Sequence, residues 1–237
     1  MPSSKNFGSH NISGRLKYLL FSILVLLIIY PFLDDGISGA AVTTLVLTAI
    51  LISGIYALGK SLTHIIMVSV VGVPWLVITW VGIFENIPML INLQPIFGIA
   101  FFAVVIGTLL LHVVKTKEVT SDILYGAICI YLLTGLLFAE VFLLFQNDVT
   151  AFSHVLDWTE RVYFSFSTLT TVGYGDIVAK SNVARAVANL ESVLGVMYTT
   201  VILARLVALY TAQHAEKIVK AQTELEIQKR RNRRPRK

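Results

Sequence analysis

The chain has 237 residues, of which 56% are apolar and only 14% are charged, and its mean hydropathy is +0.76. A soluble domain carries roughly a quarter charged residues, so this composition excludes an ordinary soluble protein. The formal net charge of +5 is confined largely to one predicted side of a membrane and to the C-terminal tail, so it does not predict nucleic-acid binding.

Six apolar runs approach or exceed the roughly 20 helical residues that cross a hydrocarbon core. We predict membrane-spanning helices at residues 18–33, 37–58, 62–84, 93–114, 123–145 and 183–211. The first run is short and follows Arg15 and Lys17, which is also the pattern of a signal peptide. Its length favours a retained span, and the sequence therefore predicts an all-α membrane protein with six transmembrane helices.

The distribution of Lys and Arg predicts that both termini are cytoplasmic. With this orientation, fifteen of the nineteen basic residues lie on the inner side: Lys5, Arg15, Lys17, Lys60, Lys115, Lys117 and nine residues between Lys217 and Lys237. Three lie on the outer side: Arg161, Lys180 and Arg185. We expect a multi-pass protein of the plasma membrane, which would be the cell inner membrane in a bacterium.

A shorter apolar segment lies between the fifth and sixth runs. It begins with Asp157 and Glu160, whose spacing is that of a capping box at a helix N-terminus. From there to Thr170 is about 14 residues, or roughly 21 Å of helix, which is too short to span a membrane. The sequence predicts a re-entrant helix that enters from the outer side and ends inside the membrane.

The segment that follows this helix is polar and rich in glycine. Gly173 and Gly175 alternate with larger residues, and glycine adopts positive φ without a steric cost from Cβ. Such an alternation lets successive carbonyl groups face one side, which an ordinary strand does not allow. A row of carbonyl oxygens is a set of ligands for a hard, weakly hydrated cation.

The stretch from Thr168 to Asp176, "TLTTVGYGD", resembles the selectivity filter of tetrameric potassium channels. The resemblance implies a filter at residues 171–175. In it, the carbonyls of Thr171, Val172, Gly173 and Tyr174, with the Thr171 hydroxyl, replace the hydration shell of K⁺, and Gly175 completes the filter. One filter strand per chain implies a homotetramer. No cofactor is implied, since K⁺ is the permeant ligand.

The same resemblance implies residues that support the filter. Asp176, Tyr163, Ser167, Thr170 and Glu140 are expected to do so, Tyr163 by a hydrogen bond to Asp176 and Glu140 by bracing the backbone near the pore loop. Many relatives have paired tryptophans where this chain has "YF", and an acidic or aliphatic residue where it has Ser167. Inactivation behaviour is therefore not carried over.

Two residues of the sixth run have open interpretations. Gly195 lies where the inner helix of the family carries a gating hinge, and the alternative is close packing against a neighbouring helix. Glu191, four residues earlier, is expected to contact the back of the filter or a neighbouring subunit.

The front half has the layout of a voltage sensor without its charges. Four spans before a pore pair are typical of voltage-gated channels, but residues 93–114 contain no Lys or Arg, which excludes a moving-arginine sensor. We divide the chain into a cytoplasmic N-terminus (1–17), a four-helix voltage-sensor-like domain (18–120), a pore domain (121–212) and a cytoplasmic helix with a basic tail (213–237).

The basic tail predicts contact with anionic lipid headgroups through Arg230, Arg231, Arg233 and Arg234. Taken together, the sequence predicts a potassium-selective channel that is not an enzyme and has an unknown gating ligand. Two alternatives stay open at this point: a weakly selective cation channel of the same fold, and a regulatory subunit that does not conduct.

Overall fold

The computed structural model describes residues 14–33, 36–58, 62–85, 87–116 and 120–232. Within these ranges the chain is all-α and contains no strand. The elements are α1 (Leu16–Ile29), the 3₁₀ helix η1 (Tyr30–Phe32), α2 (Ile37–Leu58), α3 (Leu62–Phe84), α4 (Pro88–Lys115), α5 (Ser121–Leu143), α6 (Trp158–Leu169) and α7 (Asn182–Asn232).

Five of these helices are long and apolar enough to cross a membrane: α2, α3, α4, α5 and the first part of α7, residues 182–215. The first predicted run, residues 18–33, forms a shorter apolar helix, Leu16–Phe32. The fourth helix starts at Pro88 rather than at residue 93, because proline fits the first helical turn, where its missing N–H is not needed.

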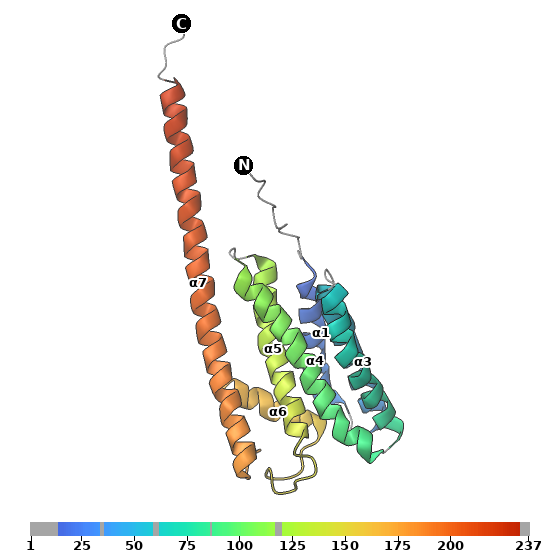
Figure 1. The fold of residues 1–237 in the computed structure, drawn as a ribbon. Helices are drawn as coiled ribbons and strands as arrows, with labels where there is room; N and C mark the ends of the chain where they lie inside the picture. Colours follow the sequence, from blue (N-terminus) through green and yellow to red (C-terminus); the bar gives the residue numbers. More distant parts are fainter. Residues whose placement is uncertain (1–13, 34–35, 59–61, 86, 117–119, 233–237) are drawn as a thin grey trace.

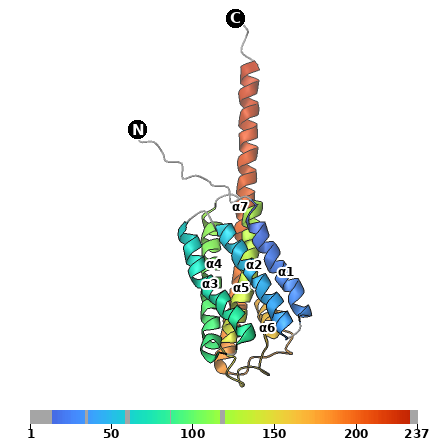
Figure 2. The ribbon, with the colours of Figure 1, turned by 90° about the vertical axis from the view of Figure 1, so that its right-hand side faces the viewer.

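Helices α1 to α5 form a bundle, and α7 runs along one edge of it (Figure 1). The short helix α6 lies between α5 and α7 near one end of the bundle. Helix α7 has 51 residues, about 77 Å at 1.5 Å per residue, and its C-terminal part projects well beyond the bundle (Figure 2). The start of α1 and the C-terminal part of α7 lie at the same end of the molecule, opposite α6.

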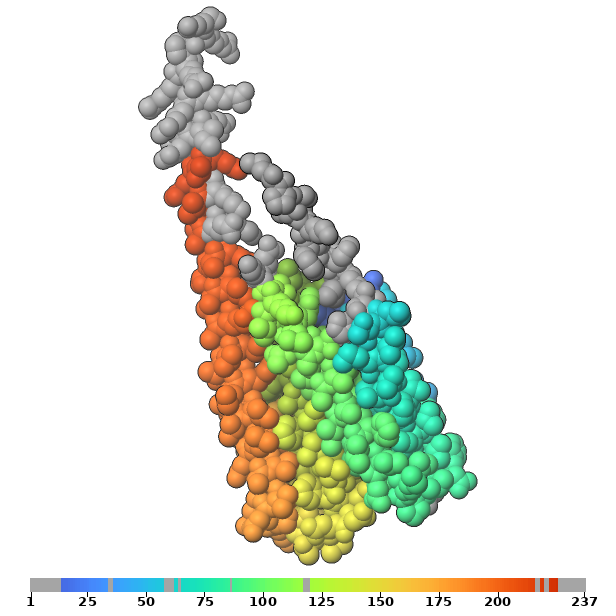
Figure 3. Space-filling view, viewed as in Figure 1, coloured from blue at the N-terminus to red at the C-terminus, as the bar shows by residue number. Residues whose placement is uncertain are grey.

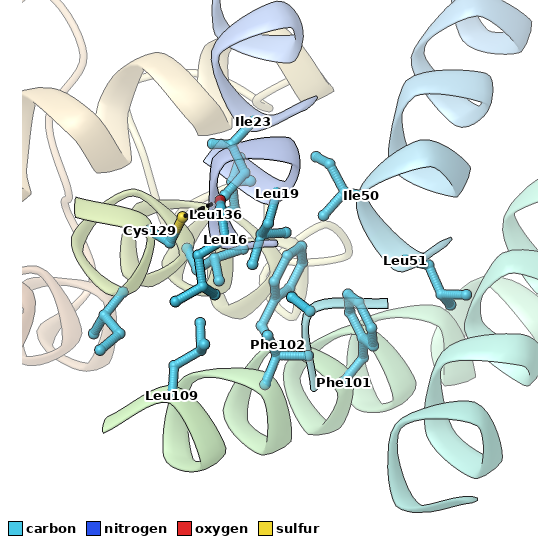
Figure 4. Packing of buried hydrophobic residues seen from close by; sticks show 14 of the residues in the cluster. Leu16, Leu19, Ile23, Ile50, Leu51, Phe101, Phe102, Leu109, Cys129 and Leu136 are labelled. Atoms are coloured by element: carbon cyan, nitrogen blue, oxygen red, sulfur yellow. Dashed lines mark hydrogen bonds between the residues drawn. The ribbon is translucent and has the colours of Figure 1, made fainter. Parts of the chain in front are cut away.

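The hydrophobic core is continuous from α1 to α5. Phe101 and Phe102 of α4 pack against Trp75 of α3, with ring centroids 5.1 and 5.3 Å from the indole. Buried residues of α1 and α5, among them Leu19 and Leu136, belong to the same cluster (Figure 4). The front helices therefore pack directly on α5 of their own chain. The packing shows no break between residues 120 and 121, so the domain boundary at this point stays a prediction.

Helix α7 is the least covered of the apolar helices. Within the chain, 67% of the most apolar window of α5 is buried, compared with 11% for α7. Large apolar side chains are exposed along its length, among them Leu190, Val193, Met197 and Val201. Figure 3 shows how α7 stands at the edge of the molecule, so this surface needs lipid or other chains to cover it.

Arg205 joins the middle of α7 to the C-terminus of α4. Its Nη2 donates to the carbonyl oxygens of Val114 and Thr116, the second at 3.1 Å. These are among the last carbonyls of α4, which have no partner inside their own helix and carry the negative end of its dipole. Arg205 therefore caps a helix other than its own.

We expect Arg205→Ala to lower the free energy of unfolding by about 1–2 kcal/mol, because the α4 carbonyls lose a cationic donor in a partly buried position. Thermal unfolding of the purified protein in detergent measures this loss. Arg205→Lys is the matched control: it keeps the charge but not the planar fork, so an intermediate value is expected. Equal unfolding temperatures for all three proteins would contradict the capping role.

Candidate functional site

The candidate site is built on α6 and the segment that follows it. Asp157 is the N-cap of α6: its side chain accepts from the backbone N–H of Glu160 at 2.7 Å, and Glu160 accepts from the N–H of Asp157 at 3.1 Å. The predicted capping box is therefore confirmed, and α6 has 12 residues. Glu160 also bonds His154 Nε2 at 2.7 Å, which links the cap to the preceding loop.

The ribbon that follows α6, residues 171–175, has an alternating backbone. Thr171, Gly173 and Gly175 have φ of 61°, 57° and 81°, and they are the residues of positive φ in this part of the chain. The positive φ predicted for the two glycines is confirmed, whereas that of Thr171 was not predicted. A β-branched residue at positive φ is a genuine outlier that costs energy, and such strain is typical of functional segments.

Two backbone hydrogen bonds tie the ribbon to the end of α6. The N–H of Thr171 donates to the carbonyl of Thr168 at 3.0 Å, and the N–H of Gly173 donates to the carbonyl of Ser167 at 3.1 Å. Ser167 thus contacts the ribbon through its backbone. The Thr170 hydroxyl donates to the Phe166 carbonyl of its own helix at 2.6 Å.

Tyr163 of α6 reaches the C-terminal end of the ribbon. Its hydroxyl donates to Asp176 Oδ2 at 2.8 Å, so the contact that the sequence suggested is present. The ring of Tyr163 also stacks on that of Tyr174, with centroids 6.0 Å apart and planes 9° from parallel. The hydrogen bond from Tyr163 holds the pKa of the Asp176 carboxyl below its usual value.

We expect Tyr163→Phe to weaken the ribbon, because the phenyl ring keeps the stacking but loses the hydroxyl that donates to Asp176. On the channel function predicted from the sequence, the expected result is a shorter single-channel open time and a stronger dependence of activity on external K⁺, both measured in planar bilayers. Asp176→Asn, which loses the same charge-assisted bond from the other partner, should show the same direction. Open times and ion dependence equal to those of the parent would refute this support.

The loops on either side of α6 pair with each other. Phe152 and Ala179 form an isolated antiparallel bridge, and the N–H of Lys180 donates to the carbonyl of Ala151 at 2.7 Å. Beneath this bridge the ring of Phe152 packs edge-on against Phe164 of α6, with centroids 5.3 Å apart. These contacts hold the start of α7 and the start of α6 in one unit.

Gly195 of α7 packs against the C-terminus of α6. A Cβ at this position would lie 2.1 Å from the carbonyl oxygen of Leu169, which is a backbone atom and cannot rotate away. The structure therefore supplies a packing reason for this glycine, in line with the alternative interpretation. The hinge stays a prediction.

Glu140 does not hydrogen-bond the pore loop. Its side chain is buried, and its Oε2 has no hydrogen-bond partner in the described part of the chain. It lines a cavity of about 380 Å³ whose wall also includes Arg161 and the N-terminal residues of α6. Glu140 and Arg161 thus line one cavity, and bracing of the backbone by Glu140 stays a prediction.

Several contacts behind the ribbon were not predicted from the sequence. Ser192 of α7 donates to the carbonyl of Thr168 at 3.2 Å, and Tyr131 of α5 donates to the carbonyl of Leu169 at 3.4 Å. Glu191 of α7, which was expected to contact the back of the filter or a neighbour without a named partner, bonds Ser165 of α6. These residues lie far apart in sequence, and no local pattern marks them as partners.

The basic tail is only partly described. Arg230 and Arg231 lie in the last turns of α7, whereas Arg233 and Arg234 lie outside the described residues. Lipid contact by these four residues therefore stays a prediction.

Comparison with known proteins covers the part of the chain that contains this site. Residues 126–212 match the model of a protein family described as ion channel. The match includes most of α5, all of α6, the ribbon and the apolar part of α7. No curated protein matches the chain. The apolar helices and the match to an ion channel domain together indicate a multi-pass membrane protein.

Proposed function

We propose that the protein is a potassium-selective channel that conducts K⁺ passively as a homotetramer. The observation that carries this proposal is the alternation of positive φ at Thr171, Gly173 and Gly175 with the intervening Val172 and Tyr174. Alternating backbone conformations turn successive peptide planes the same way, so their carbonyl oxygens form one row. Four such rows around an axis replace the hydration shell of a K⁺ ion.

The strain at Thr171 supports the same assignment. Its positive φ places a β-branched residue in a conformation that glycine would adopt without cost. The presence of threonine rather than glycine at this position is explained if the Thr171 hydroxyl supplies a further oxygen ligand at the inner end of the row. Tyr174 favours potassium selectivity over the weakly selective alternative, because non-selective relatives alter the filter at this position.

Surfaces that are exposed in a single chain support a tetramer. The ribbon is exposed in one chain, with 53% of Val172 and 72% of Tyr174 accessible to solvent. A hollow of about 500 Å³ lies between the ribbon and α7, lined by Thr171, Gly173 and Asn189 among others. The uncovered apolar face of α7 borders the same region, so neighbouring copies would back the ribbon and cover α7 together.

Six spans, a re-entrant α6 and cytoplasmic termini complete the proposal. Residues Leu16–Phe32 form about 27 Å of combined α and 3₁₀ helix, close to the hydrocarbon thickness of about 30 Å, and α1 packs beside α2 and α5. An even number of spans agrees with the position of the start of α1 and the C-terminal part of α7 at one end of the molecule (Figure 1). We place the protein in the plasma membrane, with the basic end of α7 near anionic lipid.

Gating is not by moving arginines in this proposal. Helix α4 has no Lys or Arg before Lys115, at its last residue, so it has no charges to carry through the membrane field. In this proposal the channel is gated either through the contacts between α4 and the pore helices or by an unidentified ligand.

Reversal potentials of the purified protein in planar bilayers test this proposal. In a K⁺ gradient with Na⁺ on both sides, we expect a reversal potential close to the potassium equilibrium value. A potential close to zero in opposed K⁺ and Na⁺ solutions would instead identify the weakly selective cation channel. Absence of current, together with absence of rubidium uptake into liposomes, would identify a subunit that does not conduct alone.

A further inference from the structure

Glu191 is a fully buried carboxyl group on the side of α7 that faces α5 and α6. Its Oε1 lies 2.5 Å from the hydroxyl oxygen of Ser165 on α6. The same hydroxyl lies 2.6 Å from the carbonyl oxygen of Gly135 on α5. Glu191 and Ser165 are both 0% exposed within a single chain, so no assembly is needed to bury them. Three oxygens thus connect the three helices around the ribbon.

The number of hydrogens in this chain of oxygens determines its protonation. Two short O···O contacts need two hydrogens, one in each contact, because oxygens without a hydrogen between them repel at such distances. The Gly135 carbonyl carries none and the Ser165 hydroxyl carries one. The second hydrogen has to be on Glu191. The carboxyl O–H then donates to Ser165, and Ser165 donates to Gly135.

The surroundings of Glu191 favour the neutral acid as well. Among the described residues no Lys, Arg or His forms an ion pair with it, and the titratable side chain that interacts with it is Tyr131 of α5. An unpaired carboxylate in such a place is far more costly than a neutral acid. The other oxygen, Oε2, has no hydrogen-bond partner, which is a smaller cost for the C=O of an acid than for a charge.

We propose that Glu191 is a positioning residue of the pore, which carries its proton at neutral pH and joins α7 through Ser165 to α5 behind the ribbon. The proposal rests on the proposed channel function for its effect on conduction. The next residue along α7, Ser192, and the glycine one turn after Glu191, Gly195, contact the carbonyls of Thr168 and Leu169 at the end of α6. A change at Glu191 is therefore transmitted to the residues from which the ribbon starts.

Glu191→Gln separates the neutral acid from the charged one. The Gln amide has the same size and donates an N–H to Ser165 in place of the acid O–H, so we expect unfolding temperature and rubidium uptake close to those of the parent. Glu191→Ala and Ser165→Ala each leave a buried polar group without a partner. For these two we expect a lower unfolding temperature and a loss of about tenfold or more in rubidium uptake.

Infrared difference spectroscopy detects directly whether the Glu191 carboxyl group is protonated. At neutral pH we expect the full-length protein to show the C=O stretch of a protonated carboxylic acid, sensitive to D₂O, and Glu191→Gln to lack this band. Glu140→Gln alters the other buried acidic side chain of the described residues, which lies on α5, and is the control for the assignment of the band to Glu191.

Two results would overturn the proposal: an acid band unchanged in Glu191→Gln, or a Gln variant as impaired as Glu191→Ala. If the parent itself takes up no rubidium, the proposed channel function fails. The infrared band and the order of the unfolding temperatures then still decide whether Glu191 carries the proton and positions the three helices.

Discussion

Liposomes that contain the Gly173→Ala protein are expected to take up no rubidium under conditions in which the parent does. The φ of Gly173 is 57°, and an L-residue in this region costs about 1–2 kcal/mol per position. In a tetramer the cost is repeated four times, about 4–8 kcal/mol in total, which is comparable to the net stability of a folded protein. The ribbon is then expected to leave the conformation in which its carbonyls form a row.

The control for this prediction is Gly107→Ala. Gly107 lies inside α4, its φ is not positive, and a Cβ there would meet no atom within 4 Å. Alanine is expected to be neutral or slightly stabilising at this site, because it is the better helix former. The assembly state of both variants is measured by size-exclusion chromatography. Rubidium uptake by an assembled Gly173→Ala protein at the rate of the parent would mean that ions do not pass along this ribbon.

The parts of the site that were predicted correctly depend on local sequence. The capping box needs only Asp157 and Glu160 three residues apart, and the structure contains both of its hydrogen bonds. The positive φ of Gly173 and Gly175 follows from the absence of a side chain. The contact between Tyr163 and Asp176 was suggested only by resemblance to a family, since 13 residues separate the two.

The parts that were missed depend on contacts between distant helices. Ser165 and Glu191 are 26 residues apart, and nothing in either segment indicates that the two side chains meet. The carbonyls at the end of α4 that accept from Arg205 are about 90 residues away in the sequence, and no local pattern marks them as its partners. The positive φ of Thr171 was missed because its residue type argues against that conformation.

The positions of the helices were also predictable from local sequence, whereas their packing was not. The apolar runs gave the positions of all the long helices, because an apolar run of this length has few other structures available in a membrane. The start of α4 was predicted too late, at residue 93, although Pro88 fits the first helical position and begins the helix. The packing of the front helices on α5 was not predictable, since apolar residues on all sides of a helix do not indicate which face meets which neighbour.

Gly195→Ala is expected to lower the stability of the protein and its conduction together. The added Cβ would lie 2.1 Å from the Leu169 carbonyl oxygen and 3.1 Å from its Cδ1. Over-packing of this kind costs about 1–3 kcal/mol and occasionally more, against a gain of at most about 1 kcal/mol in helix propensity. The backbone of α6 has to move away from α7, which displaces the residues that lead into the ribbon.

Thermal unfolding and rubidium uptake of the same preparation distinguish close packing from a hinge at this glycine. Close packing predicts a lower unfolding temperature for Gly195→Ala and a still lower one for Gly195→Val, with uptake falling in the same order. A hinge predicts a normal unfolding temperature with an altered open probability, because alanine stiffens the helix without crowding its neighbour. A variant as stable as the parent would therefore contradict the packing role and leave the gating hinge as the reason for glycine at this position.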